Sequence, residues 1–130
     1  MNIKIIGNTP LLLHRYVPEE VTTKTKEEKA IEYKVEWKKG VYLDKEGFIC
    51  WPSTNMMQVL FDGAKGLTRG KVFFTRLLFT TIGIGPLLIP FLVEGKKITL
   101  QTVEDQGWID ITGVKIGTAR VNRARVMLPI

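Results

Sequence analysis

The alternation of apolar and polar residues is clearest between residues 41 and 66, where it predicts two strands followed by a helix. Residues 41–43 and 48–51 are short apolar runs rich in aromatic side chains. Residues 44–47 join them as a charged turn ending in glycine, which is typical of a hairpin with a short loop. Pro52 has no N–H to donate to a strand ladder, so we expect the second strand to end there.

A helix is expected directly after Pro52. The hydroxyl of Ser53 or Thr54 can accept a backbone N–H of the first helical turn, which makes either residue a suitable N-terminal cap. Gly66 is the expected end of the helix. Five apolar residues recur at helical spacing and form one face, namely Met56, Met57, Leu60, Phe61 and Ala64.

The first third of the chain is less regular. Residues 2–7 are an expected strand, broken at residues 8–10 before a second apolar run at residues 11–14. These runs are either one kinked strand or a strand followed by a buried crossing segment. Residues 26–37 fit helical spacing and strand alternation equally well, and we expect a helix that turns into a strand after Glu32.

The most apolar part of the chain is residues 72–93, which carry no charge from Leu77 onward. Glycines and prolines crowd this segment, so buried strands broken at residues 83–86 are favoured over a helix that crosses a membrane. If the apolar surface is not covered within one chain, we expect it to be a subunit interface.

Two alternating segments follow, residues 96–103 and 108–114, and they predict a second hairpin. Ile109 and Ile111 point to one face of it, and Trp108, Asp110 and Thr112 to the other. Residues 118–127 form a late strand. The expected fold is therefore α+β, a single domain over residues 1–130 with a mostly antiparallel sheet and two helices.

Composition narrows the possible functions. The chain has 130 residues, of which 45% are hydrophobic, and a net charge of +6. This charge favours polyanionic partners, nucleic acid first and an acidic membrane surface second. Cys50 is the only cysteine and His14 the only histidine, so we expect no disulfide, no structural zinc site and no cofactor. The start of the chain lacks the pattern of a signal peptide, which favours the cytoplasm.

A cluster of cations near the end of the chain is the strongest functional signal. Residues 115–125 contain no carboxylate. They carry four cations, namely Lys115, Arg120, Arg123 and Arg125. Arg69 and Lys71 belong to a second cluster without acids. Guanidinium groups bind phosphate and stack on bases, so we expect these residues to contact a nucleic-acid backbone. The competing interpretation is an edge strand protected from aggregation by charge.

The strand pattern divides the arginines, because Arg123 and Arg125 share one face and Arg120 lies on the other. Aromatic residues on expected strands could stack single-stranded bases, and the candidates are Tyr42, Phe48, Trp51 and Trp108. Trp108 is favoured because its face also carries polar residues. The competing interpretation is that these rings are part of the core.

Catalysis has little support. His14 stands beside Arg15 and Tyr16, a group that could cleave RNA by acid–base chemistry, but a single histidine after an apolar run is commonly structural. Cys50 lies in an apolar run and should be inert. We therefore expect a protein that is not an enzyme.

Two resemblances agree with this expectation. The segments at residues 8–14, 41–52 and 117–125 together look like a group of small uncharacterised proteins of bacteriophages and prophages. Residues 50–64 resemble the "proline, small polar pair, helix" segment of the RAMP superfamily, the RNA-binding proteins of CRISPR effector complexes. That resemblance implies a ferredoxin-like, RRM-like core, with residues 113–125 in the place of the family's glycine-rich loop. The late glycines here are sparser than in that family.

The sequence therefore predicts a non-enzymatic protein of viral or mobile-element origin that binds single-stranded RNA or DNA. We expect no membrane partner, and a homo-oligomer or a subunit of a larger complex. The alternative is a viral structural or assembly protein that oligomerises through its apolar surface and has no nucleic-acid role.

Overall fold

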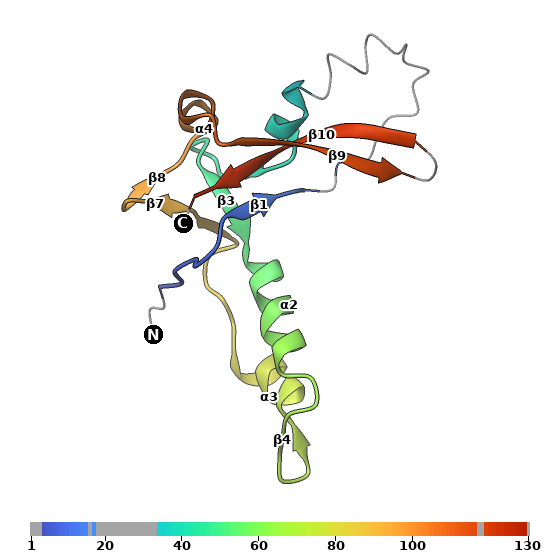
Figure 1. Cartoon of the computed structure of the whole chain (residues 1–130). Coiled ribbons are helices and arrows are strands. Elements are labelled where there is room, and N and C mark those ends of the chain that lie inside the picture. Colours follow the sequence, from blue (N-terminus) through green and yellow to red (C-terminus); the bar gives the residue numbers. More distant parts are fainter. Residues whose placement is uncertain (1–3, 16, 18–33, 117–118, 130) are drawn as a thin grey trace.

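The structure is a computed structural model that describes residues 4–15, 17, 34–116 and 119–129 (Figure 1). It is an α+β fold of small antiparallel sheets and short helices, as expected. The expected count of two helices is wrong, because three helices and helical residues 34–39 are present. The described strands do not show a clear ferredoxin-like order.

The first sheet has three antiparallel strands in the order β1 (Leu11–Leu13), β10 (Ala119–Leu128) and β9 (Ile109–Ile116). The competing interpretation of the cationic segment as an edge strand is partly wrong, because the last residues of β10 lie between β9 and β1. Alternate residues of this end are buried, namely Ala124, Val126 and Leu128. Apolar burial therefore fixes which face of β10 meets the core.

The second sheet confirms the predicted first hairpin. It has the order β2 (Tyr42–Leu43), β3 (Ile49–Pro52) and β6 (Leu88–Pro90). The Asp44 carboxylate accepts the backbone N–H groups of the turn, and Gly47 has a φ of 85°, which only glycine adopts without strain. Pro52 is the last residue of β3, as expected.

The core lies where the two sheets meet the helical residues 34–39 and α4 (Leu100–Gln106), at the upper end of the molecule in Figure 1. The backbone N–H of Ile49 donates to Ile98 O at 2.8 Å and links the second sheet to the segment before α4. The strand alternative for residues 34–37 is wrong, since they are helical and carry Trp37 into the core. The largest fully buried side chains are Ile49, Ile98, Val103 and Val126.

The helix predicted after Pro52 is α2 (Ser53–Gly63). The capping prediction is wrong, because no side chain caps this helix and Ser53 is already its first, buried residue. Pro52 takes the cap position, and its fixed φ suits an extended residue before a helix. The helix ends at Gly63 and not at Gly66, which lies in the following turn with a φ of 80°.

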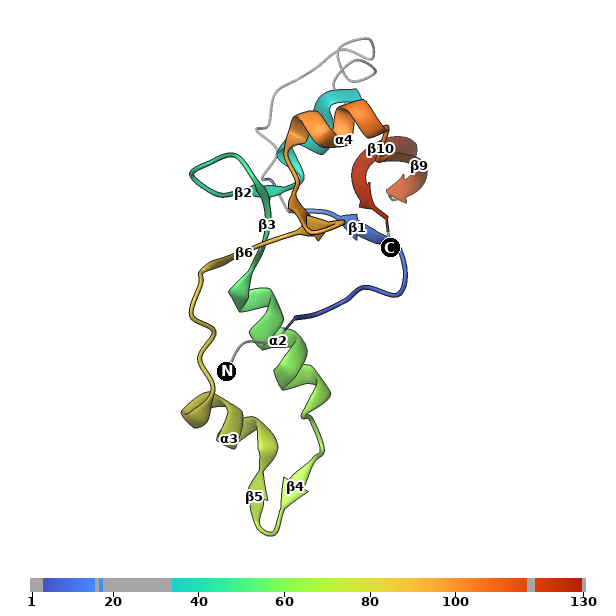
Figure 2. The ribbon, with the colours of Figure 1, turned by 90° about the vertical axis from the view of Figure 1, so that its left-hand side faces the viewer.

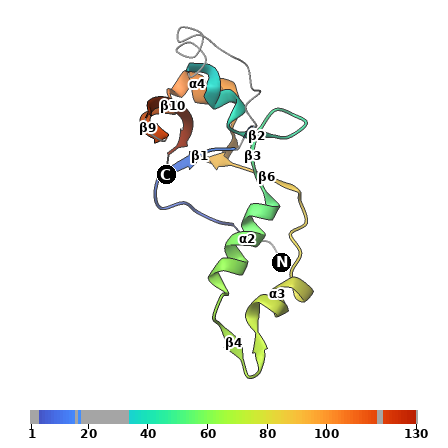
Figure 3. The same ribbon diagram turned by 90° about the vertical axis from the view of Figure 1, so that its right-hand side faces the viewer.

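Residues 53–87 form an arm that leads away from the sheets (Figures 1 and 2). Beyond α2 the arm contains β4 (Thr68–Arg69), β5 (Val72–Phe73) and α3 (Phe74–Thr81). Figure 3 shows the chain returning from α3 toward β6 beside α2.

The prediction of buried strands throughout residues 72–93 is therefore wrong in its first half. Residues 74–81 are helical, and their apolar positions also fit helical spacing. The hydroxyls of Thr80 and Thr81 donate to the carbonyl of Leu77 in the preceding turn. Six large apolar residues of this region are exposed, namely Val72, Phe73, Phe74, Ile82, Leu87 and Leu92.

The predicted second hairpin is also wrong. After β7 (Leu92–Val93) and β8 (Lys96–Lys97), the chain forms α4 instead of continuing as a strand. Thr99 and Thr102 make a reciprocal capping box, and Gly107 ends the helix with a φ of 65°. These caps override the apolar alternation, and β9 consequently pairs with β10.

Candidate functional site

Lys115 and Arg120 lie directly opposite each other in the β9–β10 ladder. Both side chains are exposed, and among the described residues no ion pair involves either of them. Residues opposite each other in an antiparallel pair share a face, where two like charges destabilise the pair. A bound anion would relieve this repulsion, so this end of the ladder favours an anionic partner.

Arg123 and Arg125 lie on the opposite face, as the alternation predicted. Arg123 forms an ion pair with Glu36, in which each side chain is only about a quarter exposed. Arg125 lies opposite Asp110, whose carboxylate accepts the hydroxyl of Thr112. Both arginine side chains are half-buried. They therefore pack against the rest of the protein and do not project freely into solvent.

The remaining expected site residues are not brought to the same place. Arg69 and Lys71 belong to the β4–β5 turn at the far end of the arm, remote from the β9–β10 ladder (Figures 1 and 2). Trp108 is half-buried and packs against the core, which favours the core interpretation of its ring. The expected single basic surface is thus divided into separate parts.

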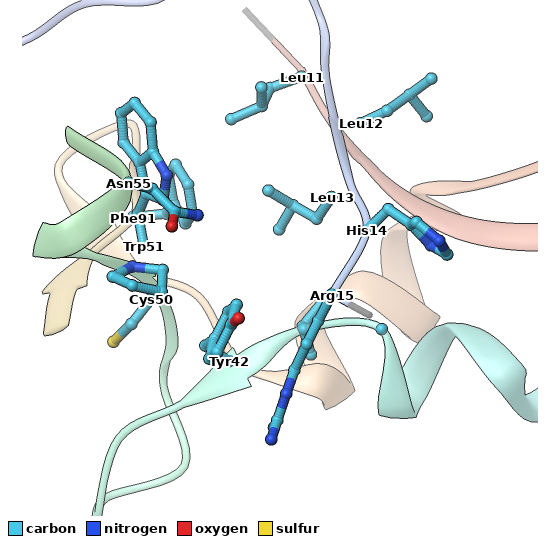
Figure 4. Close-up of a pocket in the computed structure, with 13 residues that line it drawn as sticks. Leu11, Leu12, Leu13, His14, Arg15, Tyr42, Cys50, Trp51, Asn55 and Phe91 are labelled. Carbon is cyan, nitrogen blue, oxygen red and sulfur yellow. The ribbon is translucent and has the colours of Figure 1, made fainter. Parts of the chain in front are cut away.

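A shallow pocket of about 180 Å³ lies between β1 and the second sheet (Figure 4). Tyr42 and Trp51, two of the aromatic residues expected on strands, line it. The rings of Trp51 and Phe91 are nearly parallel, with centroids 6.3 Å apart and an angle of 13° between their planes. The guanidinium of Arg15 lies 4.8 Å from the centre of the Tyr42 ring.

Two residues of this pocket, Asn55 and Phe91, were not singled out from the sequence, and Arg15 was named there only as a neighbour of His14. The sequence signal for the aromatic wall was the hairpin at residues 41–51, which supplies Tyr42 and Trp51. Phe91 joins them only because its N–H donates to Ile49 O at 3.0 Å, a contact across 42 residues of chain. His14 lines the rim, is exposed and points away from the pocket (Figure 4).

Cys50 is a buried free cysteine of β3. Burial raises the pKa of the Cys50 thiol, whose Sγ donates to Phe48 O, which favours the protonated form of this group. In the described part of the chain, no three His, Cys, Asp or Glu residues are grouped to hold a metal ion. Tyr16, the third member of the group around His14, lies outside the described residues.

None of the described helices is long and apolar enough to cross a membrane.

Comparison with protein-family models, with curated proteins and with solved structures finds no match for this chain. The resemblances to phage proteins and to the RAMP superfamily therefore stay predictions.

Proposed function

We propose that the protein binds single-stranded RNA or DNA and performs no chemistry on it. The observation that carries this proposal is the pairing of Lys115 with Arg120, two exposed cations on one face of the β9–β10 ladder. Phosphates of a nucleic-acid strand would neutralise both charges and release their counterions. The net charge of +6 favours the same class of partner.

The other expected contacts keep smaller roles in this proposal. Arg69 and Lys71 would form a second, separate contact with the nucleic acid at the end of the arm. Arg123 and Arg125 would support the ladder and contact phosphate only with their exposed parts. Trp108 would stack a base only through the part of its surface that the core leaves uncovered.

A viral or mobile-element origin, a ferredoxin-like core and a place in a larger complex belong to the same proposal. The α+β fold and the strand-to-helix transition at Pro52 support them, because the RAMP superfamily has the same local order. Fold alone does not carry the function, so the cationic pair is the part to test.

The test is a fluorescence-anisotropy titration with labelled single-stranded RNA, single-stranded DNA and duplex DNA at two salt concentrations. We expect binding selective for single strands that weakens with salt. The double variant Lys115→Ala, Arg120→Ala should lower affinity and reduce the salt slope by about 1.4, as expected when two single-strand phosphate contacts are lost.

The matched control is Lys45→Ala, Lys96→Ala, which removes two exposed lysines elsewhere and changes net charge equally. A parent protein that binds nothing at low salt contradicts the proposal. So does an equal loss of affinity in the control variant, because the effect would then be that of net charge alone.

A second candidate function is assembly through the arm without a nucleic-acid role. The observation that favours it is the exposure of apolar side chains at both ends of the arm, such as Phe73 (60%) and Leu87 (81%), since exposed apolar surface is typical of an interface. Sedimentation velocity over a range of concentrations tests it. Phe73→Ser should lower the oligomer mass, whereas Ile111→Ser, an exposed apolar residue of β9, should not.

A further inference from the structure

The pocket between β1 and the second sheet has two walls of different character (Figure 4). Leu11 and Leu13 point into it from β1, whereas Leu12 and His14 point to the other side of that strand. The opposite wall is aromatic and comes from Trp51 and Phe91. A flat apolar ligand would therefore contact aliphatic groups on one side and a ring on the other.

The aromatic wall is held in place by backbone hydrogen bonds. Trp51 lies opposite Ile89 in the β3–β6 ladder, and the N–H of Phe91 donates to Ile49 O. The two rings are nearly parallel, and both are half-buried, so part of each remains accessible. A preformed ring surface stacks a planar ligand with little loss of side-chain entropy.

Polar groups lie at the rim of the same pocket. Asn55 is exposed in the first turn of α2, and its amide can both donate and accept a hydrogen bond. Arg15 is exposed with its guanidinium over the Tyr42 ring, and no described acid forms an ion pair with it. The N–H of Arg15 donates to Gly40 O at 2.7 Å, which fixes the backbone beside the pocket.

The volume of the pocket limits the size of a planar ligand that it can accept. The pocket of about 180 Å³ is smaller than the 300–1,000 Å³ typical of sites for drug-sized ligands. A pocket of this size has room for one ring system, with the Asn55 amide at its edge and the Arg15 guanidinium beside it. These three features match one nucleotide, with a flat base, hydrogen-bonding groups at the base edge and an adjacent phosphate.

We propose that this pocket binds one base of a single-stranded nucleic acid, stacked on the Trp51 wall. Asn55 hydrogen-bonds the base edge, and Arg15 contacts the neighbouring phosphate. This inference rests on the proposed function, because the ligand is part of the strand bound there. It adds a second contact site, distinct from the Lys115–Arg120 pair.

The experiment compares a short single-stranded oligomer, the same oligomer with all bases removed but one, and free nucleoside monophosphates, using anisotropy and competition. We expect Trp51→Leu to weaken oligomer binding about 5- to 150-fold, the range for loss of one stacked base. Asn55→Ala and Arg15→Gln change exposed side chains and should also weaken binding without affecting folding. The matched controls are Phe48→Leu, an aromatic residue of the same hairpin, and Arg76→Gln, an exposed arginine of α3.

The outcomes separate the two proposals. If pocket variants bind the oligomer as the parent does, while Lys115→Ala, Arg120→Ala weakens it, the pocket inference is overturned and the proposed function stands. If monophosphates bind in the pocket and oligomers do not, the ligand is a free nucleotide and both proposals are overturned. Weakening by Asn55→Ala and Arg15→Gln, but not by the controls, supports the inference even if Trp51→Leu fails to fold.

Discussion

Arg123 of β10 forms an ion pair with Glu36 of the helical residues 34–39, a contact across 87 residues of chain. Trp37, next to Glu36, enters the core, so the pair lies beside the buried part of the molecule. The guanidinium of Arg123 is consequently paired with a carboxylate of the same chain. Arg120 lies on the other face of the strand, where its side chain stays exposed.

This relationship predicts different effects for the two arginines. Arg123→Ala should lower the free energy of unfolding by about 1 kcal/mol or more, because it leaves the Glu36 carboxylate, which is only about a quarter exposed, without this cation. Glu36→Gln should have a similar effect. The double variant Glu36→Gln, Arg123→Ala should lose less unfolding free energy than the sum of the two single variants. Urea denaturation of the four proteins measures this coupling. Arg120→Ala is the control and should not lower stability, because it removes the repulsion between Arg120 and Lys115; a loss equal to that of Arg123→Ala would contradict the assignment.

The capping box of α4 gives a second prediction. Thr99 Oγ1 accepts the N–H of Thr102 at 3.2 Å, which satisfies a helix-end donor that has no partner within the helix. Thr99→Ala should lower the free energy of unfolding by about 1 kcal/mol. Thr99→Ser keeps the capping hydroxyl and should lose only a small part of that free energy. Chemical denaturation distinguishes the two. Equal stability of the Ala and Ser variants would mean that the cap contributes nothing.

Asp44 makes stability depend on pH. Its carboxylate accepts the N–H groups of Phe48 and Glu46, both at 2.9 Å, and the Phe48 hydrogen bond is the main reason its pKa lies below the ordinary 3.8. A lowered pKa in the folded state means that this contribution is complete above the unfolded value and is lost as pH falls through the folded value.

Asp44→Asn tests this dependence, because asparagine does not titrate. The difference in unfolding free energy between parent and variant should be constant near neutral pH and shrink below about pH 4. Urea denaturation at several pH values measures it. A difference that grows on acidification would have the wrong sign and would reject this role for the carboxylate.

Core and arm should respond differently to the loss of an apolar side chain. Ile98 is 1% exposed, and Ile98→Ala should cost about 2–5 kcal/mol because it leaves a cavity in the core. Leu87 is 81% exposed, and Leu87→Ala should change monomer stability by less than about 0.5 kcal/mol. Thermal denaturation at low protein concentration compares them. A large loss for Leu87→Ala under these conditions would indicate that the arm is covered by another chain.

The sequence predicted most reliably what depends on neighbouring residues. The hairpin of β2 and β3 was predicted because Asp44 and Gly47 make a turn from their own hydrogen bonds and backbone freedom. The helix after Pro52 was predicted from its apolar spacing. Its expected hydroxyl cap was wrong, because Ser53 is buried where β3 meets the helix.

The alternation of apolar and polar residues gave a wrong prediction where helix caps determine the local structure. Residues 96–103 alternate like a strand, yet Thr99, Thr102 and Gly107 begin and end a helix there. In the candidate pocket, Tyr42 and Trp51 were named as stacking candidates and Arg15 only as a neighbour of His14, whereas Asn55 and Phe91 carried no sequence signal. A pocket residue without a local pattern is found only when distant segments pair.

By itself, the sequence determined the α+β class, the first hairpin, the α2 helix, the apolar surroundings of Cys50 and the opposite faces of Arg120 and Arg123. Each follows from turn chemistry, side-chain period or composition, which act over a few residues. Only the tertiary structure decided that β10 lies between β1 and β9, that Arg123 pairs with Glu36, and that the arm stays exposed. These features depend on which distant apolar surfaces are buried together, and no pattern within a short segment specifies that.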